Sequence, residues 1–202
     1  MISSVAVQAD LSRSAPQVLG GSLTIRQATP DDARAIHELI TGHREEGRLL
    51  PRHLGEIAVH ASRFVVAGDE GELVGCVDLA PLSRTVAEIR SLVVDEDARS
   101  AGIGRQLIDA AIARAKTAGF ERVCAFTHAP SFFVKLGFSI VPHDWLPEKI
   151  STNCGTCPQF RTCGQWAVML PFRSAFAKAS ASAKAPADKP ADKRVAVASL
   201  HG

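Results

Sequence analysis

One stretch decides the fold of this chain: Glu88-Ile-Arg-Ser-Leu-Val-Val-Asp-Glu-Asp-Ala-Arg-Ser-Ala-Gly-Ile-Gly-Arg-Gln-Leu107. It begins as an apolar strand, continues through an acidic loop of small residues and ends in an amphipathic helix. The first N–H groups of a helix have no partner within the helix and lie at the positive end of its dipole. A strand, a glycine loop and a helix in this order therefore predict a site for an anion, most commonly a phosphate.

The glycine loop does not match two common phosphate motifs. The chain contains neither Gly-x-x-x-x-Gly-Lys-Ser/Thr nor the full Gly-x-Gly-x-x-Gly fingerprint of dinucleotide-binding folds. What remains, Arg99-Ser-Ala-Gly102-Ile-Gly104, resembles the acetyl-coenzyme A (acetyl-CoA) pyrophosphate loop of the GNAT acyltransferases. The alternative interpretation is a tight turn in which the glycines adopt positive φ angles.

Length and composition restrict the class of protein. With 202 residues, the chain accommodates one ordinary domain and its tails. It has neither a long apolar run nor a basic and then apolar N-terminal segment, so we expect no membrane span and no secretion. Its five cysteines, an odd number, predict reduced thiols in a cytoplasmic protein.

Charge is distributed unevenly along the chain. Of the net charge of +2, residues 173–202 carry +4, from six Lys or Arg and two Asp residues, which leaves −2 for the remainder. The remainder is therefore not expected to bind nucleic acid. We predict a loose leader at 1–22, one domain at 23–172 with a cysteine-containing loop at 144–164, and a disordered Ala/Lys/Pro-rich tail at 173–202.

Strands and helices follow one another across residues 23–172. A capping box at Thr29-Pro-Asp-Asp32 opens the first helix, and Gly119 ends the longest one. The expected strands are 23–28, 63–67, 72–79, 87–94, 122–127, 138–141 and 166–170; the expected helices are 29–42, 54–61, 103–118 and 130–136. This order resembles the GNAT fold. The resemblance implies an α/β (α+β) domain with a mixed, mostly antiparallel central sheet, splayed at the acetyl-CoA site and flanked by helices.

The resemblance also implies where acetyl-CoA binds. In GNAT enzymes the strand before the glycine loop leaves its neighbour, and its exposed backbone pairs with the pantetheine arm. A main-chain N–H there holds the thioester oxygen, where negative charge builds during acyl transfer. The implied cofactor-binding residues are Leu92, Val93, Val94, Arg99, Ser100, Ala101, Gly102, Ile103, Gly104, Arg105 and Phe132.

A second segment, Ala129-Pro-Ser-Phe-Phe-Val-Lys-Leu-Gly-Phe138, resembles the GNAT motif Tyr-x-x-Leu-Gly-Phe, whose tyrosine protonates the leaving thiolate. Here Phe132 or Phe133 stands at the tyrosine position, and the chain contains no tyrosine at all. A phenolic general acid is thereby excluded. We expect water or the proton of the amine to reach the sulfur, since a thiolate, with a thiol pKa near about 8.5, is a fair leaving group.

Two residues are candidates for the base that takes a proton from the attacking amine. Glu88, at the start of the central strand, is the first, and its alternative interpretation is an exposed charge at a strand end. His128, directly after the neighbouring strand, is the second, and its alternative is a structural histidine.

Several short segments resemble the compact bacterial N-acetylglutamate synthases. They are Leu49-Leu-Pro-Arg52, Glu88-Ile-Arg90-Ser-Leu-Val-Val, Phe132-Phe-x-Lys-Leu-Gly-Phe, Leu146-Pro-x-Lys149 and Cys154-x-x-Cys157-Pro. The resemblance implies acetyl transfer from acetyl-CoA to the α-amino group of L-glutamate, by direct attack in a ternary complex, for arginine biosynthesis. The alternatives are another small amine or a protein N-terminus as acceptor, and a non-catalytic acetyl-CoA sensor. Many GNAT enzymes pair through sheet edges, so a homodimer is one expected assembly, whereas membrane and nucleic-acid partners are not expected.

A dicarboxylate acceptor requires cations, and arginine forks suit carboxylates best. On strict alternation Glu88, Arg90 and Leu92 share one face of the central strand, so Glu88 and Arg90 would line one cleft. The alternatives are a Glu88–Arg90 pair on a solvated face and, for Arg52, a surface charge in a loop. The substrate-binding candidates are Arg52, Arg90, Thr127 and Lys149.

Three cysteines, Cys154, Cys157 and Cys163, have the spacing of a metal knuckle. Three thiolates are one ligand short of a structural zinc site, which nearly always has four. The candidates for a fourth ligand are Cys124, His128 and His143. The alternative, which we favour from the sequence, is a cluster of reduced thiols or a redox-labile loop.

Overall fold

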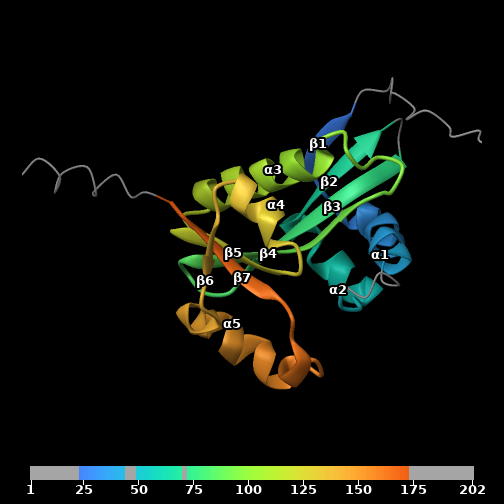
Figure 1. Ribbon diagram of the computed structural model, residues 1–202. Helices are drawn as coiled ribbons and strands as arrows, with labels where there is room; N and C mark the ends of the chain where they lie inside the picture. The colour runs from blue at the N-terminus through green and yellow to red at the C-terminus, as the bar shows by residue number, and fades with distance from the viewer. Residues whose placement is uncertain (1–22, 44–48, 70–71, 173–202) are drawn as a thin grey trace, which may run out of the picture. The chain divides into compact units, whose positions relative to one another are not determined.

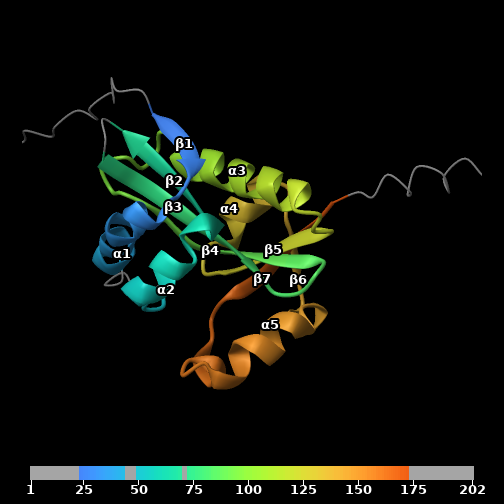
Figure 2. The same cartoon turned by 180° about the vertical axis from the view of Figure 1, so that it is seen from behind.

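The computed structural model describes residues 23–43, 49–69 and 72–172, which form a central sheet with helices on both of its faces (Figures 1 and 2). The predicted leader 1–22 and tail 173–202 lie outside the described residues. No helix in the described part combines the length and the apolar character that crossing a membrane requires.

In the described part of the chain the sheet has seven strands, and all but one neighbouring pair run antiparallel. The strands are β1 (Thr24–Gln27), β2 (Phe64–Asp69), β3 (Glu72–Pro81), β4 (Val86–Val94), β5 (Arg122–Thr127), β6 (Ser139–Val141) and β7 (Trp166–Pro171). Their order across the sheet is β1-β2-β3-β4-β5-β7-β6, and the parallel pair is β4–β5. The mixed, mostly antiparallel sheet predicted from the sequence is confirmed.

The helices are short except for one that crosses the sheet. They are α1 (Ala33–Gly42), α2 (Leu54–Val59), α3 (Ile103–Thr117), α4 (Pro130–Lys135) and α5 (Pro147–Thr152), with 3-10 turns at Pro30–Asp32, Ala61–Arg63, His143–Trp145, Cys154–Thr156 and Phe160–Thr162. The predicted capping box is present, because the Thr29 N–H donates to Asp32 Oδ2 at 2.7 Å. Gly119, with φ +83°, ends the longest helix as predicted.

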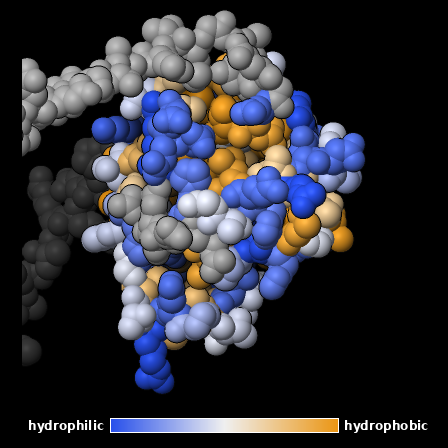
Figure 3. Space-filling view, turned by 90° about the vertical axis from the view of Figure 1, so that its right-hand side faces the viewer, coloured by the Kyte–Doolittle hydropathy of each residue, from blue (hydrophilic) through white to orange (hydrophobic). Residues whose placement is uncertain are grey.

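Alternation along the strands divides the core into two layers. Val65, Val77 and Ile89 face α3 and α4, whereas Phe64 and Val66 face α1 and α2 on the other side (Figures 1 and 2). The segment around α5 covers the same side as α1 and α2, over a smaller cluster that includes Leu146. Figure 3 shows apolar residues gathered at the surface between hydrophilic ones, on the right-hand side of the molecule in Figure 1.

A β-bulge interrupts β4 and corrects the expectation of strict alternation. Cys76 of β3 pairs with Val93, but Asp78 pairs with Arg90, so two residues of β4, Ser91 and Leu92, lie opposite one residue of β3. Ser91 takes up the extra length with a φ of +51°. As a result Leu92 packs on the α3 face with Ile89, opposite to Glu88 and Arg90. The bulge is the physical reason why Leu92 does not share their face.

Candidate active site

The parallel strands β4 and β5 separate in the middle of the sheet. Their pairing covers Val86–Arg122 to Glu88–Cys124 and then ends, while β4 continues along β3 as far as Val94. The edge of β4 that faces β5 beyond Glu88 therefore carries main-chain N–H and C=O groups without a strand partner. Such groups require other partners when they are buried, which makes this edge a binding surface for an extended ligand. The splayed sheet predicted from the sequence is confirmed.

A cavity of about 640 Å³ opens at this separation. It is lined by the second half of β4, the glycine loop, the start of α3, the end of β5 and the start of α4. All three predicted backbone residues, Leu92 to Val94, line it. So do all the predicted residues of the loop except Ala101. Its size is typical of a pocket for a small molecule or cofactor.

The two glycines of the loop have different reasons to be glycine. Gly102 adopts a φ of +76° directly before α3, so the tight-turn interpretation holds for its backbone. Gly104 has no positive φ, but a Cβ built there would lie 3.6 Å from the Phe132 ring and 3.7 Å from a Val94 methyl group. Both of those side chains line the cavity, so the missing side chain at Gly104 widens it where α3 begins.

Arg99 in the glycine loop and Arg105 at the start of α3 each have a partner close by in the chain. The Arg99 Nε–H donates to the Val94 carbonyl at 3.2 Å, and its Nη1 lies 3.6 Å from Glu96. Arg105 is largely exposed and lies 3.6 Å from Asp109 in the next turn of α3. Both arginines are among the residues that line the cavity next to the α3 N-terminus. Positive charge beside unpaired helix N–H groups suits an anionic ligand.

Of the two phenylalanines at the tyrosine position, Phe132 has the more open place. Phe132 is half-buried and lines the cavity beside Gly104. Phe133 also lines it but is 5% exposed and packs edge-on against Phe138 in the core. Neither ring carries an ionisable proton, so the cavity wall at this position supplies contact area and no acid.

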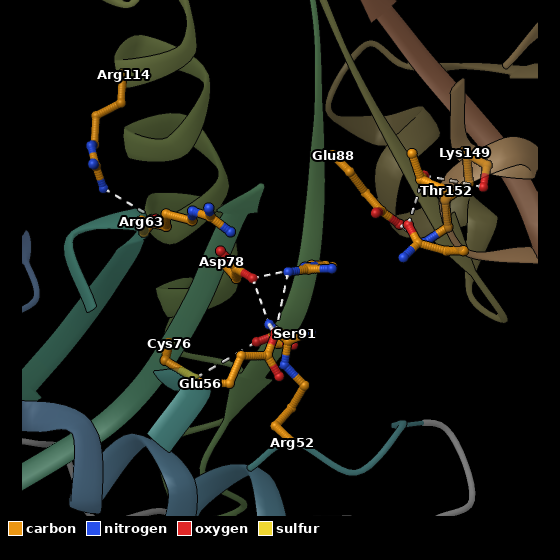
Figure 4. A network of polar contacts seen from close by, with 12 residues as sticks. Arg52, Glu56, Arg63, Cys76, Asp78, Glu88, Ser91, Arg114, Lys149 and Thr152 are labelled. Atoms are coloured by element: carbon orange, nitrogen blue, oxygen red, sulfur yellow. Dashed lines mark hydrogen bonds and ion pairs between the residues drawn. The ribbon is translucent and has the colours of Figure 1, made fainter. Parts of the chain in front are cut away.

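A network of charges lies on the face of the sheet opposite α3 (Figure 4). Asp78 of β3 is 1% exposed, and its Oδ2 accepts hydrogen bonds from Arg90 Nε at 2.7 Å and Arg52 Nη2 at 2.9 Å. Glu56 of α2 lies farther away, at 3.3 Å from Arg52 and 3.9 Å from Arg90. Burial lowers the pKa of the Arg52 guanidinium, and the charge of Arg90 lowers it further. Nearby carboxylates oppose both effects. The two guanidiniums therefore require anions around them.

Glu88 and Lys149 form a second pair on the same face. Lys149 Nζ of α5 lies 2.6 Å from Glu88 Oε1, and Glu88 is 2% exposed. The second carboxylate oxygen, Oε2, is buried and has no hydrogen-bond partner among the described residues. The Lys149 ammonium also lies 5.4 Å from the centre of the Phe126 ring, which lines the cavity. Glu88 is thus not the exposed strand-end charge of the alternative interpretation.

Not every predicted acceptor residue reaches the cavity. Arg90, Thr127 and His128 line it, whereas Arg52, Glu88 and Lys149 are not among its lining residues. Arg52 shares the Asp78 carboxylate with Arg90, and Lys149 pairs with Glu88, which precedes a lining residue of β4. The Thr127 hydroxyl accepts a hydrogen bond from the Ala129 N–H at 3.0 Å. His128 is exposed and faces Gly164 of the cysteine-containing loop.

Asp78 and Glu56 are not among the site residues expected from the sequence. Asp78 is a single carboxylate within the apolar run Val74-Gly-Cys-Val-Asp-Leu-Ala80, and such an isolated charge in a strand is the signal that points to a buried partner. Glu56 gives no comparable signal, because an acid near the start of a helix is common on surfaces.

The cysteine-containing loop does not assemble a metal site. Cys154 and Cys157 are half-buried, Cys163 is exposed, and all are free thiols. Across residues 23–43, 49–69 and 72–172, no three His, Cys, Asp or Glu side chains are placed to bind one metal ion. Burial raises the pKa of the Cys154 thiol. The zinc hypothesis therefore gains no support from the positions of these side chains, and the cluster of reduced thiols stays a prediction.

Comparison with known proteins relates the chain to acetyltransferases. The model of the acetyltransferase (GNAT) family matches residues 30–138. An uncharacterized N-acetyltransferase of Chlorobaculum tepidum is 34% identical over 145 residues, 72% of this chain and 94% of that protein. An amino-acid acetyltransferase of Ralstonia nicotianae is 32% identical over 126 residues, 61% of this chain but only 28% of its own length.

Among solved structures, one of N-acetylglutamate synthase from Neisseria gonorrhoeae, complexed with coenzyme A and N-acetyl-glutamate, superposes with a TM-score of 0.68. The two sequences are 26% identical, and the match covers 76% of this chain and 36% of that one. The chain therefore spans about a third or less of the amino-acid acetyltransferase and the synthase that it matches.

Proposed function

This chain belongs to the GNAT acetyltransferase family, and we propose that it transfers the acetyl group of acetyl-CoA to the α-amino group of L-glutamate. The product, N-acetylglutamate, would serve arginine biosynthesis. The observation that carries the proposal is Arg90. Arg90 is one of the residues that line the cavity where β4 leaves β5, and Asp78 holds its guanidinium beside a second one, that of Arg52. Relatives named amino-acid acetyltransferase and a solved N-acetylglutamate synthase support the choice of acceptor.

The cavity fits the co-substrate. Acetyl-CoA supplies the thioester-linked acetyl group. We infer that the N–H groups at the start of α3, with Arg99 and Arg105, hold its pyrophosphate, because these residues line the cavity where the helix begins. The unpaired edge of β4 offers donors and acceptors to an amide-containing arm, and a main-chain N–H there would donate to the thioester oxygen. Gly104 leaves the space that a side chain would fill between Val94 and Phe132.

We propose that Glu88 is the general base and takes the proton of the attacking amine through a water molecule. Glu88 stands at the residue where β4 and β5 separate, and its Oε2 is free of protein partners in the described part of the chain. His128 is the alternative base, because its ring lines the cavity directly. With no tyrosine in the chain, the departing thiolate takes its proton from water or from the amine.

The acceptor site is specific for carboxylates in this proposal. A guanidinium has five N–H donors in a planar fork, and Asp78 engages Nε of Arg90. The other edge of the Arg90 fork remains available for a carboxylate of the acceptor, with Glu56 only at 3.9 Å from Nη2. Bidentate pairing of this kind explains why arginine, rather than lysine, stands at this position.

A second candidate acceptor is an amino acid with a single carboxylate. The observation that favours it is charge balance, because the three cations Arg52, Arg90 and Lys149 already lie against three carboxylates. A site that is neutral before the acceptor binds has less attraction for a second negative charge.

The Arg90→Ala variant tests carboxylate recognition. We expect KM for glutamate to rise about tenfold or more, because a hydrogen bond to a charged group contributes about 1.5–3 kcal/mol. KM for acetyl-CoA should stay within about twofold, since the Arg90 guanidinium is not placed at the pyrophosphate end of the cavity. The measurement is steady-state release of the coenzyme A thiol, with each substrate varied in turn.

Arg34→Ala is the matched control, because Arg34 is an exposed arginine of α1 that pairs with Glu38 and is not among the residues that line the cavity. Equal effects of Arg90→Ala on both substrates, or none on glutamate, would contradict the assignment. Binding of acetyl-CoA without any thiol release from glutamate or another amine would instead favour a sensor.

A further inference from the structure

The two carboxylates that contact Arg52 and Arg90 differ in how firmly they are held. Asp78 is 1% exposed, and its contacts to the two arginines measure 2.9 Å and 2.7 Å. The Glu56 side chain is 38% exposed, and its contacts to the same two arginines measure 3.3 Å and 3.9 Å. Figure 4 shows Glu56 and Asp78 on different elements, α2 and β3, with the side chain of Arg52 between them.

This difference decides which of the two carboxylates can give up its contacts with the arginines. Removing one partner from a buried ion pair leaves an uncompensated charge and is strongly destabilising, so Asp78 is fixed. An exposed pair contributes little, because water and salt compete with it. The Glu56 carboxylate can therefore turn to solvent at small cost, and a better placed carboxylate can take over its contacts.

The surroundings of the arginines favour such an exchange. The two guanidiniums lie close enough for each to act on the other, and Arg52 is mostly buried, so both require negative charge. The Arg52 Nε–H is buried and has no acceptor among the described residues, and Arg90 lies at the cavity wall. An incoming carboxylate at this place finds this unsatisfied donor as well as charge.

We propose that the Glu56 carboxylate is a placeholder for a carboxylate of the acceptor: it bridges Arg52 and Arg90 until an anionic acceptor binds and displaces it. The inference rests on the proposed function, because it assumes that the acceptor is anionic. It adds a specificity device, since an amine without a carboxylate cannot displace Glu56 and leaves the arginines occupied.

The test is Glu56→Gln, which keeps the size of the side chain and removes its charge. KM for L-glutamate should fall about two- to fivefold, the range that corresponds to the loss of one competing exposed ion pair. The turnover number and KM for acetyl-CoA should stay within about twofold. The expected direction is opposite to that of Arg90→Ala.

Glu38→Gln is a closely matched control. Glu38 also pairs with the arginine four residues before it, at 3.2 Å, and is exposed on α1. If the loss of one negative charge alone attracted the anionic acceptor, the two variants would behave alike. An unchanged or raised KM for glutamate in Glu56→Gln, or an equal fall in Glu38→Gln, overturns the proposal.

Calorimetric binding of glutarate separates this inference from the proposed function. Glutarate has two carboxylates and no amine, so its binding does not depend on acetyl transfer. Tighter binding to Glu56→Gln than to the wild type, again about two- to fivefold, supports the placeholder even if the chain does not acetylate glutamate. Equal affinities, or no glutarate binding by either protein, overturn the placeholder role of Glu56 even if the chain acetylates glutamate.

Discussion

At the acceptor side of the cavity, single residues determine which charges are available. Asp78 accepts hydrogen bonds from both Arg52 and Arg90 and is buried, so we assign it the role of fixing the positions of the two guanidiniums. Glu88 has one oxygen on Lys149 and one without a partner in the described part of the chain, which makes it both an ion-pair member and a candidate base. Structural and catalytic interpretations of Glu88 predict different behaviour of its variants.

Comparison of Glu88→Gln with Lys149→Met separates the two roles. If Glu88 is the base, Glu88→Gln should lower the turnover number about 100-fold or more, the usual contribution of a positioned base. Lys149→Met breaks the same ion pair from the other side but keeps the carboxylate, so its turnover number should fall far less. Stopped-flow or steady-state thiol release measures both, with thermal unfolding as a check of the fold.

Similar losses in both variants would show that the pair matters only for structure. In that case His128→Ala becomes the decisive variant, since His128 is the other candidate base at the cavity wall.

The five thiols are expected to differ in reactivity. Burial raises the pKa of Cys76 and Cys124 to about 12, with the charges of Asp78 and Glu88 adding to the effect. At pH 8 these two stay protonated, and only a thiolate reacts with an aromatic disulfide reagent. We expect Cys154, Cys157 and Cys163 to react in the folded protein, and Cys76 and Cys124 only after denaturation. Mass spectrometry of the labelled peptides measures the rate at which each cysteine reacts. Equal labelling rates for all five would contradict the burial of the two core thiols.

Within the candidate site, the sequence predicted the relative orientation of residues that belong to the same strand. Glu88 and Arg90 were expected on one face, and they do point to the same side of β4, because alternation holds up to the bulge. What the sequence did not reveal is their partners. Asp78 meets Arg90 through the register of β3 on β4, and Glu56 meets both arginines through the packing of α2. Register and packing depend on the whole sheet, so no local pattern specifies them.

At the scale of elements, the bulge in β4 is the feature that sequence periodicity could not supply. Neither residue of the bulge, Ser91 or Leu92, is a glycine or proline that would mark an irregularity in the sequence. The bulge nevertheless shifts every later residue of β4 to the other face. Because of this shift Val93 packs on the α1 side and Leu92 on the α3 side. The glycine loop, by contrast, was read correctly as the link to α3, since its strand, turn and helix signals are all local.

Packing of α3 on β3 leads to a prediction about stability. A Cβ on Gly75 would lie 3.0 Å from a Leu107 methyl group and 3.2 Å from the Val93 carbonyl oxygen. Gly75→Ala should therefore lower the free energy of unfolding by about 1–3 kcal/mol, as overpacking of a core does. Urea unfolding followed by circular dichroism measures the change.

Gly55→Ala is its control, because Gly55 lies in α2 and a Cβ there has no neighbouring atom within 4 Å. Alanine favours a helix interior over glycine, so this variant should be neutral or more stable by about 0.5–1 kcal/mol. A Gly75→Ala protein as stable as Gly55→Ala would contradict the close approach of α3.

At the scale of the whole molecule, the sequence order of strands and helices was sufficient to predict the GNAT fold. The mixed, mostly antiparallel sheet of the described residues and the separation of β4 from β5 agree with that prediction. The acceptor is a finer property than the fold. Fold and co-substrate follow from local signals around residues 88–107, whereas the acceptor depends on α2, β3, β4 and α5 together. The family relationship therefore establishes acetyl transfer from acetyl-CoA, and the charges around Arg90 carry the proposal of glutamate.

The most direct test of that proposal is kcat/KM for a panel of acceptors at a fixed, saturating concentration of acetyl-CoA, with coenzyme A release as the readout. The panel contains L-glutamate, L-aspartate, L-glutamine and a short peptide with a free N-terminus. Our account predicts the highest value for L-glutamate, with acetylation of its α-amino group confirmed by mass spectrometry of the product. A higher kcat/KM for the peptide or for L-glutamine than for L-glutamate would contradict it.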